Sequence, residues 1–219
     1  MKRFFALLFL VFTISTAAEA AEGQLKDTPR YLLYLPAQVK TRRAPLVLAL
    51  SPVADSYSLL MAWKEVANNH GWIILASKEF RNGVDSDLFL PQLETILKEA
   101  ISTYPIDTSR IAVTGFSGGA MGSYMVACAY PRLIRAVVVN TGVIHESYTQ
   151  QPEKHPFPRQ KLAVLLASPA DHLYHEMKNN RDFLNARGWE TAWIEFGGGH
   201  DIAPSSAYEK AAQWLETQW

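Results

Sequence analysis

The sequence predicts an α/β protein in which helices cover both faces of one mostly parallel central sheet. Short, almost wholly aliphatic runs alternate with longer segments whose apolar residues recur at helical spacing. Strands that are covered on both faces carry such continuous apolar runs, and strands that alternate with helices typically form a parallel sheet. No linker, repeat or low-complexity tract interrupts the alternation, so we expect residues 21–219 to form a single domain.

Several apolar runs are expected to be strands. The polar turn 40–43 lies between the first two runs, and we therefore expect these two strands to be neighbours. Helix-length segments separate the later runs, as parallel strands require. The expected strands are residues 31–35, 46–50, 72–76, 111–114, 136–139, 162–167 and 191–196.

The segments between and after these runs are expected to be helices. The second of them places Leu93 and Leu97 on one face, and Gly188 can provide a left-handed cap where the fourth one ends. The longest irregular piece, 142–160, lies between two strands, and we interpret it as a loop near the site rather than a domain boundary. The expected helices are residues 58–69, 88–103, 121–129, 172–187 and 205–218.

Charge and cysteine content argue against several classes of protein. The chain has 21 acidic and 21 basic residues, so no basic surplus exists to neutralise nucleic-acid phosphates. The only cysteine, Cys128, cannot form an internal disulfide. Its apolar helical surroundings indicate a small buried residue rather than a catalytic thiol.

The first 20 residues have the pattern of a secretory signal peptide. Lys2 and Arg3 are basic, and an uncharged apolar run follows at 4–14. Ala18 and Ala20 then place small residues at the positions that a signal peptidase reads. The apolar run is too short to span a bilayer unaided, and the alternative is an uncleaved anchor. We expect export to the periplasm or the extracellular space, with no membrane span in the mature chain.

A glycine-rich turn joins the expected strand 111–114 to the helix that follows it. The turn is Gly115-Phe116-Ser117-Gly118-Gly119. The serine must take a strained backbone conformation to project its hydroxyl from the sheet, and the outer glycines let the strand and helix backbones approach each other. This context makes Ser117 the candidate nucleophile. The alternative is a glycine-rich turn without chemistry.

A serine hydroxyl needs a base to take its proton, and His200 is the candidate among the six histidines. It follows the last expected strand in the loop Gly197-Gly198-Gly199-His200-Asp201, where the glycines let the backbone turn over the sheet edge. The alternative is a surface histidine on a glycine loop. The spacing of His172 and His175 is a weak metal signal, and a solvated helix face is the simpler interpretation. The remaining histidines are interpreted as a helix cap or loop residues: His70, His145 and His155.

The third member of a triad orients the imidazole, and Asp171 is the candidate. It follows the expected strand 162–167, so it lies at the carboxyl end of a parallel strand, at the same sheet edge as Ser117 and His200. The chain order Ser, Asp, His is typical of one large hydrolase class. The alternative is an N-cap for the next helix, and one aspartate can do both. The rival acids are Glu146 and Asp201.

Four segments of this chain mark one family. They are Tyr34-Leu35-Pro36, Pro45-Leu46-Val47-Leu48-Ala49-Leu50, the run from Ile106 through Gly119, and Asp171 together with Gly198-Gly199-His200. With these segments the chain resembles small exported α/β-hydrolases that include feruloyl esterases, polyhydroxybutyrate depolymerases and, more loosely, dienelactone hydrolases. The resemblance extends from about residue 31 to residue 215. It implies the α/β-hydrolase fold and a triad that matches Ser117, Asp171 and His200.

The chain departs from this family after the expected strand 46–50. Relatives have His-Gly there, and the backbone just after that pair donates one of two hydrogen bonds in the oxyanion hole. Here the residues are Ser51-Pro52, and proline has no N–H to donate. Val53 or Ala54 could still donate, with Gly118 as the other donor. Loss of one donor costs on the order of 100-fold in rate.

The expected reaction is hydrolysis of a carboxylic ester through an acyl-enzyme on Ser117, without a metal or organic cofactor. The expected substrate is a small-molecule or polymer-borne ester. Segments 142–160 and 51–57 are expected to edge an open site that has no lid domain. The alternatives are a weakly active or non-catalytic binding protein on the same scaffold, an acyltransferase, or a peptidase. The sequence leaves the substrate and the oligomeric state open.

Overall fold

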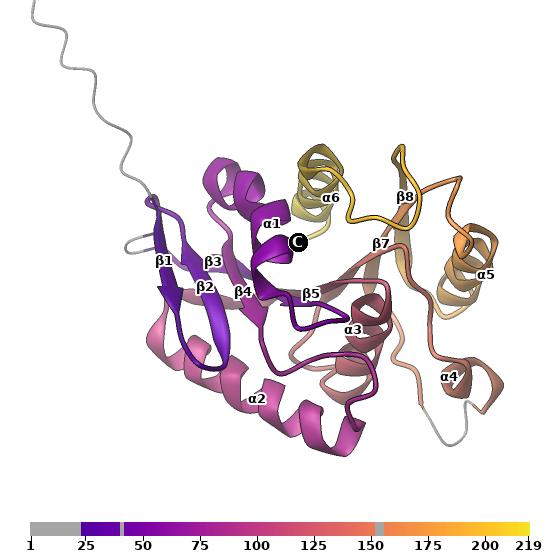
Figure 1. Ribbon diagram of the computed structural model, residues 1–219, viewed down its shortest axis with the longest axis horizontal. Coiled ribbons are helices and arrows are strands. Elements are labelled where there is room, and N and C mark those ends of the chain that lie inside the picture. Colours follow the sequence, from indigo (N-terminus) through magenta and orange to yellow (C-terminus); the bar gives the residue numbers. More distant parts are fainter. Residues whose placement is uncertain (1–22, 40–41, 152–155) are drawn as a thin grey trace, which may run out of the picture.

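Figure 1 shows the computed structural model of the protein, which describes residues 23–39, 42–151 and 156–219. The expected signal peptide, residues 1–20, lies outside the described residues. Among the helices of the described part, none combines the length and the apolar character needed to cross a bilayer.

The described strands form an eight-stranded sheet in the order β1-β2-β4-β3-β5-β6-β7-β8. The pairings of β1 with β2 and of β2 with β4 are antiparallel, and all later pairings are parallel. The predicted mostly parallel sheet is therefore confirmed. The strands are β1 (Gln24–Asp27), β2 (Tyr31–Leu35), β3 (Ala44–Leu50), β4 (Ile73–Ser77), β5 (Ile106–Phe116), β6 (Ala136–Asn140), β7 (Leu162–Ala167) and β8 (Glu190–Glu195).

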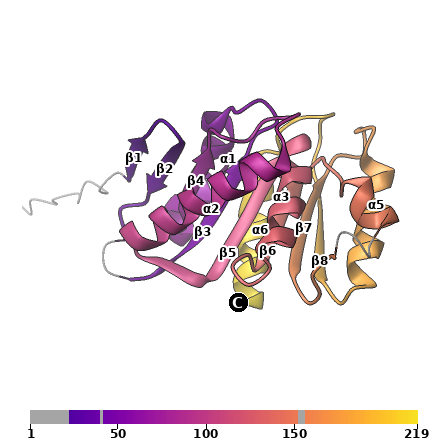
Figure 2. The ribbon, with the colours of Figure 1, turned by 90° about the horizontal axis from the view of Figure 1, so that it is seen from below.

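Helices cover both faces of the sheet, as predicted. Figures 1 and 2 show α1 and α6 on one face and α2, α3 and α5 on the other. The short helix α4 lies in the long connection between β6 and β7, which was expected to be a loop. No lid domain is inserted between the strands in the part of the chain described. The helices are α1 (Ser56–His70), α2 (Ser86–Thr103), α3 (Gly118–Ala129), α4 (Glu146–Gln150), α5 (Tyr174–Asn185) and α6 (Ser205–Gln218).

The prediction that the first two apolar runs are neighbouring strands is wrong, because β4 lies between β2 and β3. Leu75 of β4 pairs with Leu33 of β2 on one side and with Leu48 of β3 on the other. An aliphatic run shows that both faces of a strand are covered, but it does not show which strand lies beside it. The chain leaves β3 through α1 and returns as β4, and this crossover fills the place next to β3.

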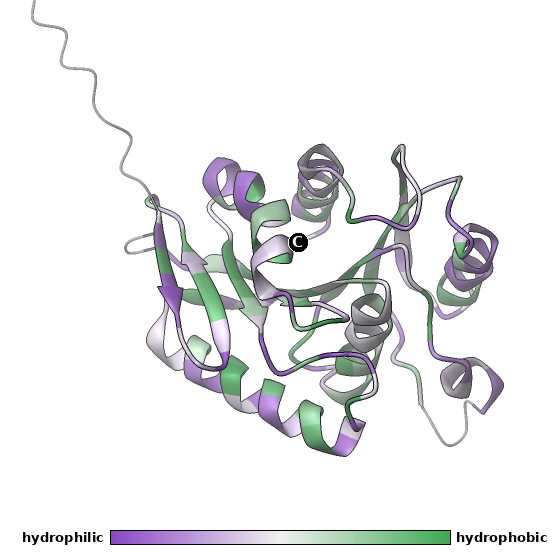
Figure 3. Ribbon diagram, viewed as in Figure 1, coloured by the Kyte–Doolittle hydropathy of each residue, from purple (hydrophilic) through white to green (hydrophobic). Residues whose placement is uncertain are grey.

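The two faces of the sheet pack two separate cores. On the side of α1 and α6, four aromatic rings pack in a row with neighbouring centroids 5.0 or 6.0 Å apart; two pairs are stacked and one is tilted. On the side of α2, α3 and α5 the core is mainly aliphatic. Figure 3 shows the strands between them as a hydrophobic layer, with hydrophilic residues on the outer sides of the helices. In order along the row, the rings belong to Tyr208, Trp63, Trp72 and Trp219.

Candidate active site

Ser117 lies in the sharp turn between β5 and α3, with a backbone φ of 54° and ψ of −120°. Positive φ is rare for a residue with a β-carbon, so the predicted backbone strain is confirmed. The Ser117 N–H donates to the carbonyl of Asn140 at 3.0 Å and thereby ties the turn to β6. A β-carbon on Gly115 would lie under 3.0 Å from the backbone of Gly119, and one on Gly119 would lie equally close to the carbonyl of Leu50. Glycine at these positions is what lets strand and helix approach.

The three side chains predicted for catalysis form one hydrogen-bonded chain. His200 Nε2 lies 2.8 Å from Ser117 Oγ, and His200 Nδ1 lies 2.6 Å from Asp171 Oδ2. The Asp171 side chain is fully buried, whereas 32% of the His200 side chain is exposed. The carboxylate is thus shielded while the imidazole can reach a bound molecule. This arrangement can move a proton from the serine to the imidazole and stabilise the imidazolium that forms.

The rival carboxylates lie elsewhere. Glu146 is exposed in α4, and the Asp201 carboxylate accepts a backbone N–H of its own loop at 3.0 Å. Neither makes a hydrogen bond to His200 in the described structure. Asp171 also accepts the Leu173 N–H at 2.7 Å through Oδ1. Since α5 begins only at residue 174, this bond stabilises the turn before the helix rather than capping its first residue.

Asn140, at the carboxyl end of β6, joins the nucleophile turn to the loop of His200. Its buried amide accepts the Ala203 N–H at 2.7 Å and the Tyr208 hydroxyl at 3.0 Å, and it donates to the Asp201 carbonyl at 3.2 Å. The backbone carbonyl of Asn140 accepts the backbone N–H of Ser117, the candidate nucleophile. We did not predict this role from the sequence. The available signal was a polar residue that ends an aliphatic strand at the expected edge.

The turn after β3 offers poor candidates for an oxyanion donor. The Val53 N–H faces Ser51 Oγ at 3.4 Å, and the Ala54 N–H donates to the Ser51 carbonyl at 3.3 Å. Ala54 has a φ of 58°, so the turn is itself strained. Gly118 is better placed, because it begins α3 directly after the nucleophile and the first N–H groups of a helix have no acceptor within the helix.

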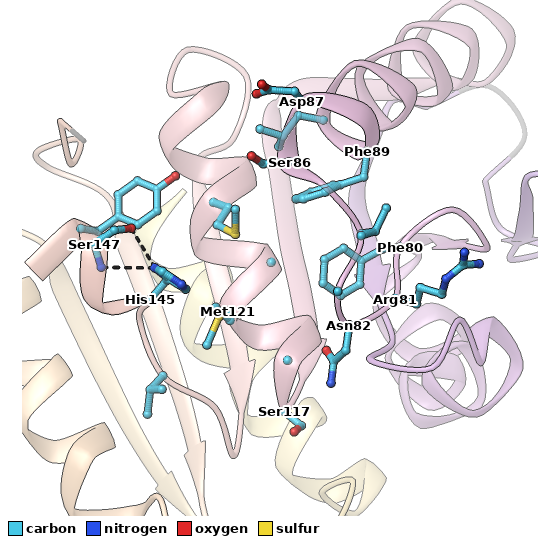
Figure 4. Close-up of a pocket in the computed structure, with 18 of the residues that line it drawn as sticks. Phe80, Arg81, Asn82, Ser86, Asp87, Phe89, Ser117, Met121, His145 and Ser147 are labelled. Carbon is cyan, nitrogen blue, oxygen red and sulfur yellow. Dashed lines mark hydrogen bonds between the residues drawn. The ribbon is translucent and has the colours of Figure 1, made fainter. Parts of the chain in front are cut away.

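A cavity of about 900 Å³ opens beside Ser117. Figure 4 shows Ser117 at one end, Asp87 at the other, and His145 with Ser147 along one side. Four residues between 143 and 148 line the cavity, so the first part of the segment 142–160 edges the site as expected. The other edge is the connection from β4 into α2, and the expected edge at 51–57 is wrong because that turn does not line the cavity. Most of the wall is apolar: Phe80, Val84, Phe89, Leu90, Met121 and Met125.

Two other groups in the described structure have side chains that could ligate a metal ion or act as a nucleophile. Donor atoms of Asp171, His172 and His200 lie within 4.8 Å of one another, a spacing that a metal ion could bridge. Both ring nitrogens of His200 are already hydrogen-bonded, one to Asp171 and one to Ser117, which suits proton transfer better than metal ligation. Burial raises the pKa of the Cys128 thiol to about 12, which keeps it protonated and unreactive.

Sequence comparison finds similar proteins among esterases, although no protein-family model matches the chain. Feruloyl esterase B of Neurospora crassa is 23% identical over 172 residues, which cover 78% of this chain and 56% of that protein. A probable acetylxylan esterase A of Aspergillus clavatus is 24% identical over 176 residues, covering 64% and 56%. That of Neosartorya fischeri is 27% identical over 126 residues, covering 51% and 34%. The chain therefore spans about half, or less, of the length of these relatives.

Solved structures resemble the chain over most of its length. Fluorophosphonate-binding serine hydrolase F of Staphylococcus aureus superposes with a TM-score of 0.68 at 12% identity, covering 89% of this chain and 99% of that one. The esterase of Pyrobaculum calidifontis gives 0.66 at 13% identity, covering 90% and 84%. At such low identity these likenesses establish the fold alone.

Proposed function

From the α/β-hydrolase fold that the chain shares with these structures, we propose that the protein is a serine hydrolase that cleaves carboxylic esters. One observation carries the proposal: the hydrogen-bonded chain from Ser117 through His200 to the buried Asp171. The relatives named as feruloyl and acetylxylan esterases support the same class of reaction. No metal or organic cofactor takes part in the proposed steps.

In the proposed mechanism, Ser117 Oγ attacks the ester carbonyl while His200 Nε2 takes its proton. Asp171 accepts the Nδ1–H of His200, which fixes the tautomer and stabilises the imidazolium. The oxyanion is held by the Gly118 N–H and a second N–H, which the sequence assigns to Val53. His200 returns the proton to the leaving alcohol, and water then attacks the acyl-enzyme in the same way. Only the neutral imidazole of His200 can accept the serine proton.

The cavity beside Ser117 supports an ester whose acyl group is apolar. Its wall includes Phe80, Phe89, Met121 and Met125, and methionine side chains can adapt to acyl groups of different shapes. The cavity is not enclosed, and this accommodates an ester that is either free or attached to a polymer.

We also propose that residues 21–219 act as a single exported domain, periplasmic or extracellular, after removal of residues 1–20. The basic, apolar and small-residue pattern of the leader supports this proposal. Expression of the full chain in a bacterium, followed by N-terminal sequencing of the exported protein, tests it. Recovery of an uncleaved, membrane-attached protein would contradict it.

The proposed function is tested with the mature protein, a fluorophosphonate probe and a p-nitrophenyl ester. Ser117→Ala should abolish labelling and lower kcat by at least about 10⁴-fold, and Asp171→Asn should lower kcat by about 10⁴-fold. Glu146→Gln should change neither probe labelling nor kcat, because this carboxylate does not contact His200. Ser102→Ala, at an exposed serine of α2, is the matched control. A Ser117→Ala protein that keeps wild-type turnover would exclude the mechanism, and labelling without turnover would favour a binding protein or an acyltransferase.

A further inference from the structure

Val53 and Ala54, the backbone candidates for the second oxyanion donor, are poorly placed for that task. Both N–H groups are directed at Ser51 atoms, and Pro52 has no N–H. An oxyanion hole with a single donor is slower by on the order of 100-fold or more than one with two. A mechanism through Ser117 therefore calls for another donor close to the Gly118 N–H.

The connection after β4 brings a side-chain amide to this place. The Asn82 N–H donates to the Pro52 carbonyl at 2.8 Å, and Arg81 forms an antiparallel bridge with Val53. The buried Phe80 ring lies so close to α3 that a β-carbon on Gly122 would come under 3.0 Å from it. The proline turn and the neighbouring ring thus hold the backbone of this connection in place.

The Asn82 side chain lies against the first residue after the nucleophile. A β-carbon on Gly118 would lie under 3.0 Å from Asn82 Oδ1 and 3.0 Å from Asn82 Nδ2. Figure 4 shows the Asn82 amide pointing toward Ser117 at the end of the cavity. Glycine at 118 therefore leaves room for the amide beside the N–H that is expected to hold the oxyanion.

We propose that Asn82 is a catalytic residue whose side-chain amide donates the second hydrogen bond to the oxyanion, in place of Val53. This inference rests on the proposed function. A half-turn about the Cβ–Cγ bond exchanges Oδ1 and Nδ2, and within the described structure no side-chain hydrogen bond holds the amide in one orientation. When the carbonyl oxygen becomes negative, the Nδ2–H and the Gly118 N–H donate to it together. A neutral amide is suited to this role because it donates without binding the anion permanently.

The first test compares Asn82→Ala and Asn82→Asp with the wild type on a p-nitrophenyl ester. Both variants should lower kcat by about 100-fold with less than threefold change in KM, because the lost bond forms mainly in the transition state. Asn179→Ala, at an exposed asparagine of α5, should keep full activity. A trifluoromethyl ketone, whose adduct with Ser117 carries an oxyanion, should inhibit the Asn82 variants more weakly by the same factor as kcat/KM falls.

The second test is a double-mutant cycle with Gly118→Ala. The added methyl group displaces the amide but keeps the N–H, so this variant alone should also lose about 100-fold. In the Asn82→Ala background the methyl group has room, and Gly118→Ala should cost less than threefold. Equal costs of Gly118→Ala in both backgrounds would overturn the inference.

The outcomes separate the inference from the proposed function. A wild-type protein that hydrolyses the ester through Ser117, together with an Asn82→Ala variant within threefold of it, overturns the role of Asn82 and leaves the proposed function standing. Parallel loss of kcat/KM and of inhibitor affinity, at an unchanged melting temperature, supports a donor rather than a structural residue. A wild-type protein that is neither labelled nor active overturns both.

Discussion

The two faces of the sheet are built from similar helices, yet only one of them borders a site. On the side of α1 and α6 the core is closed, and Trp63 is completely buried between Trp72 and Tyr208. On the side of α2 and α3 the core stops short of the carboxyl edge of the sheet, and the space left over is the cavity beside Ser117.

The difference indicates that the closed face contributes mainly to the stability of the fold and that the cavity face carries the reactive groups. The closed face has no described member of the hydrogen-bonded chain from Ser117 to Asp171. Its rings pack against one another, and two of them also donate hydrogen bonds, Trp72 to Glu216 of α6 and Tyr208 to Asn140 at the end of β6. The cavity face carries exposed polar groups and partly buried methionines, which cost stability and leave room for a ligand. We therefore expect variants of the closed face, apart from those of Tyr208, to change stability alone and variants of the cavity face to change activity.

The largest effect on stability is expected from Trp63→Ala on the closed face. Removing a fully buried ring should lower the free energy of unfolding by about 3–5 kcal/mol. At a temperature where the variant is folded, kcat should stay within twofold of the wild type. Urea unfolding and ester hydrolysis measure the two quantities.

The control for this prediction is Trp193→Ala in β8. The Trp193 ring is only partly buried, so its removal should lower the free energy of unfolding by less than half as much as Trp63→Ala. A large fall in kcat for Trp63→Ala at full folding would show that the closed face does shape the site.

Most of the sheet and the positions of the three candidate catalytic residues could be predicted from the sequence. Strands β3, β4, β6 and β7 and the second half of β5 are largely aliphatic because both of their faces are covered. Ser117, Asp171 and His200 each follow a strand at the same edge. β1 could not be predicted, because its four residues are exposed and show no apolar pattern.

The contacts that position the site could not be predicted, because they join residues that only folding brings together. Asn140 meets Tyr208 across 68 residues, and Asn82 meets Gly118 across a helix and a strand. Single polar residues in loops or at strand ends carry no periodicity, so their partners depend on how the helices pack. The cavity follows from the same packing and has no signature in the sequence.

A smaller effect, on specificity, is expected from Met121→Trp on the cavity face. Met121 lines the cavity one helical turn after Ser117, and a larger ring would fill the space proposed for the acyl group. The kcat/KM for p-nitrophenyl octanoate should fall by about tenfold or more, while that for the acetate should change less than threefold. Steady-state kinetics on both esters measures the change.

Met61→Trp is the matched control, since Met61 is exposed on α1. Equal losses for the acetate and the octanoate in Met121→Trp would show that the variant disturbs the nucleophile turn and that the acyl group lies elsewhere.

The smallest effect is expected where α1 meets α6 on the closed face. His70 was interpreted as a helix cap, but its ring lies 2.6 Å from Glu209 and 3.0 Å from Glu216. Burial alone would lower the pKa of His70, and the two carboxylates outweigh this effect and raise it above its ordinary value. A raised pKa in the folded state means that protonation stabilises the fold. The contribution is complete below the pKa of the unfolded chain and disappears as the pH rises through the folded value.

His70→Gln should therefore narrow the stability difference between acidic and alkaline conditions. Relative to the wild type, we expect it to lose up to about 1 kcal/mol of unfolding free energy near pH 5.5 and much less near pH 8.5, because the pair is partly solvated. Urea unfolding at the two pH values measures the difference, and kcat should be unchanged at both. A loss that is larger at pH 8.5 would mean that the neutral ring is the stabilising form. The closed face would then join α1 to α6 by packing and neutral hydrogen bonds, without a charged bond between them.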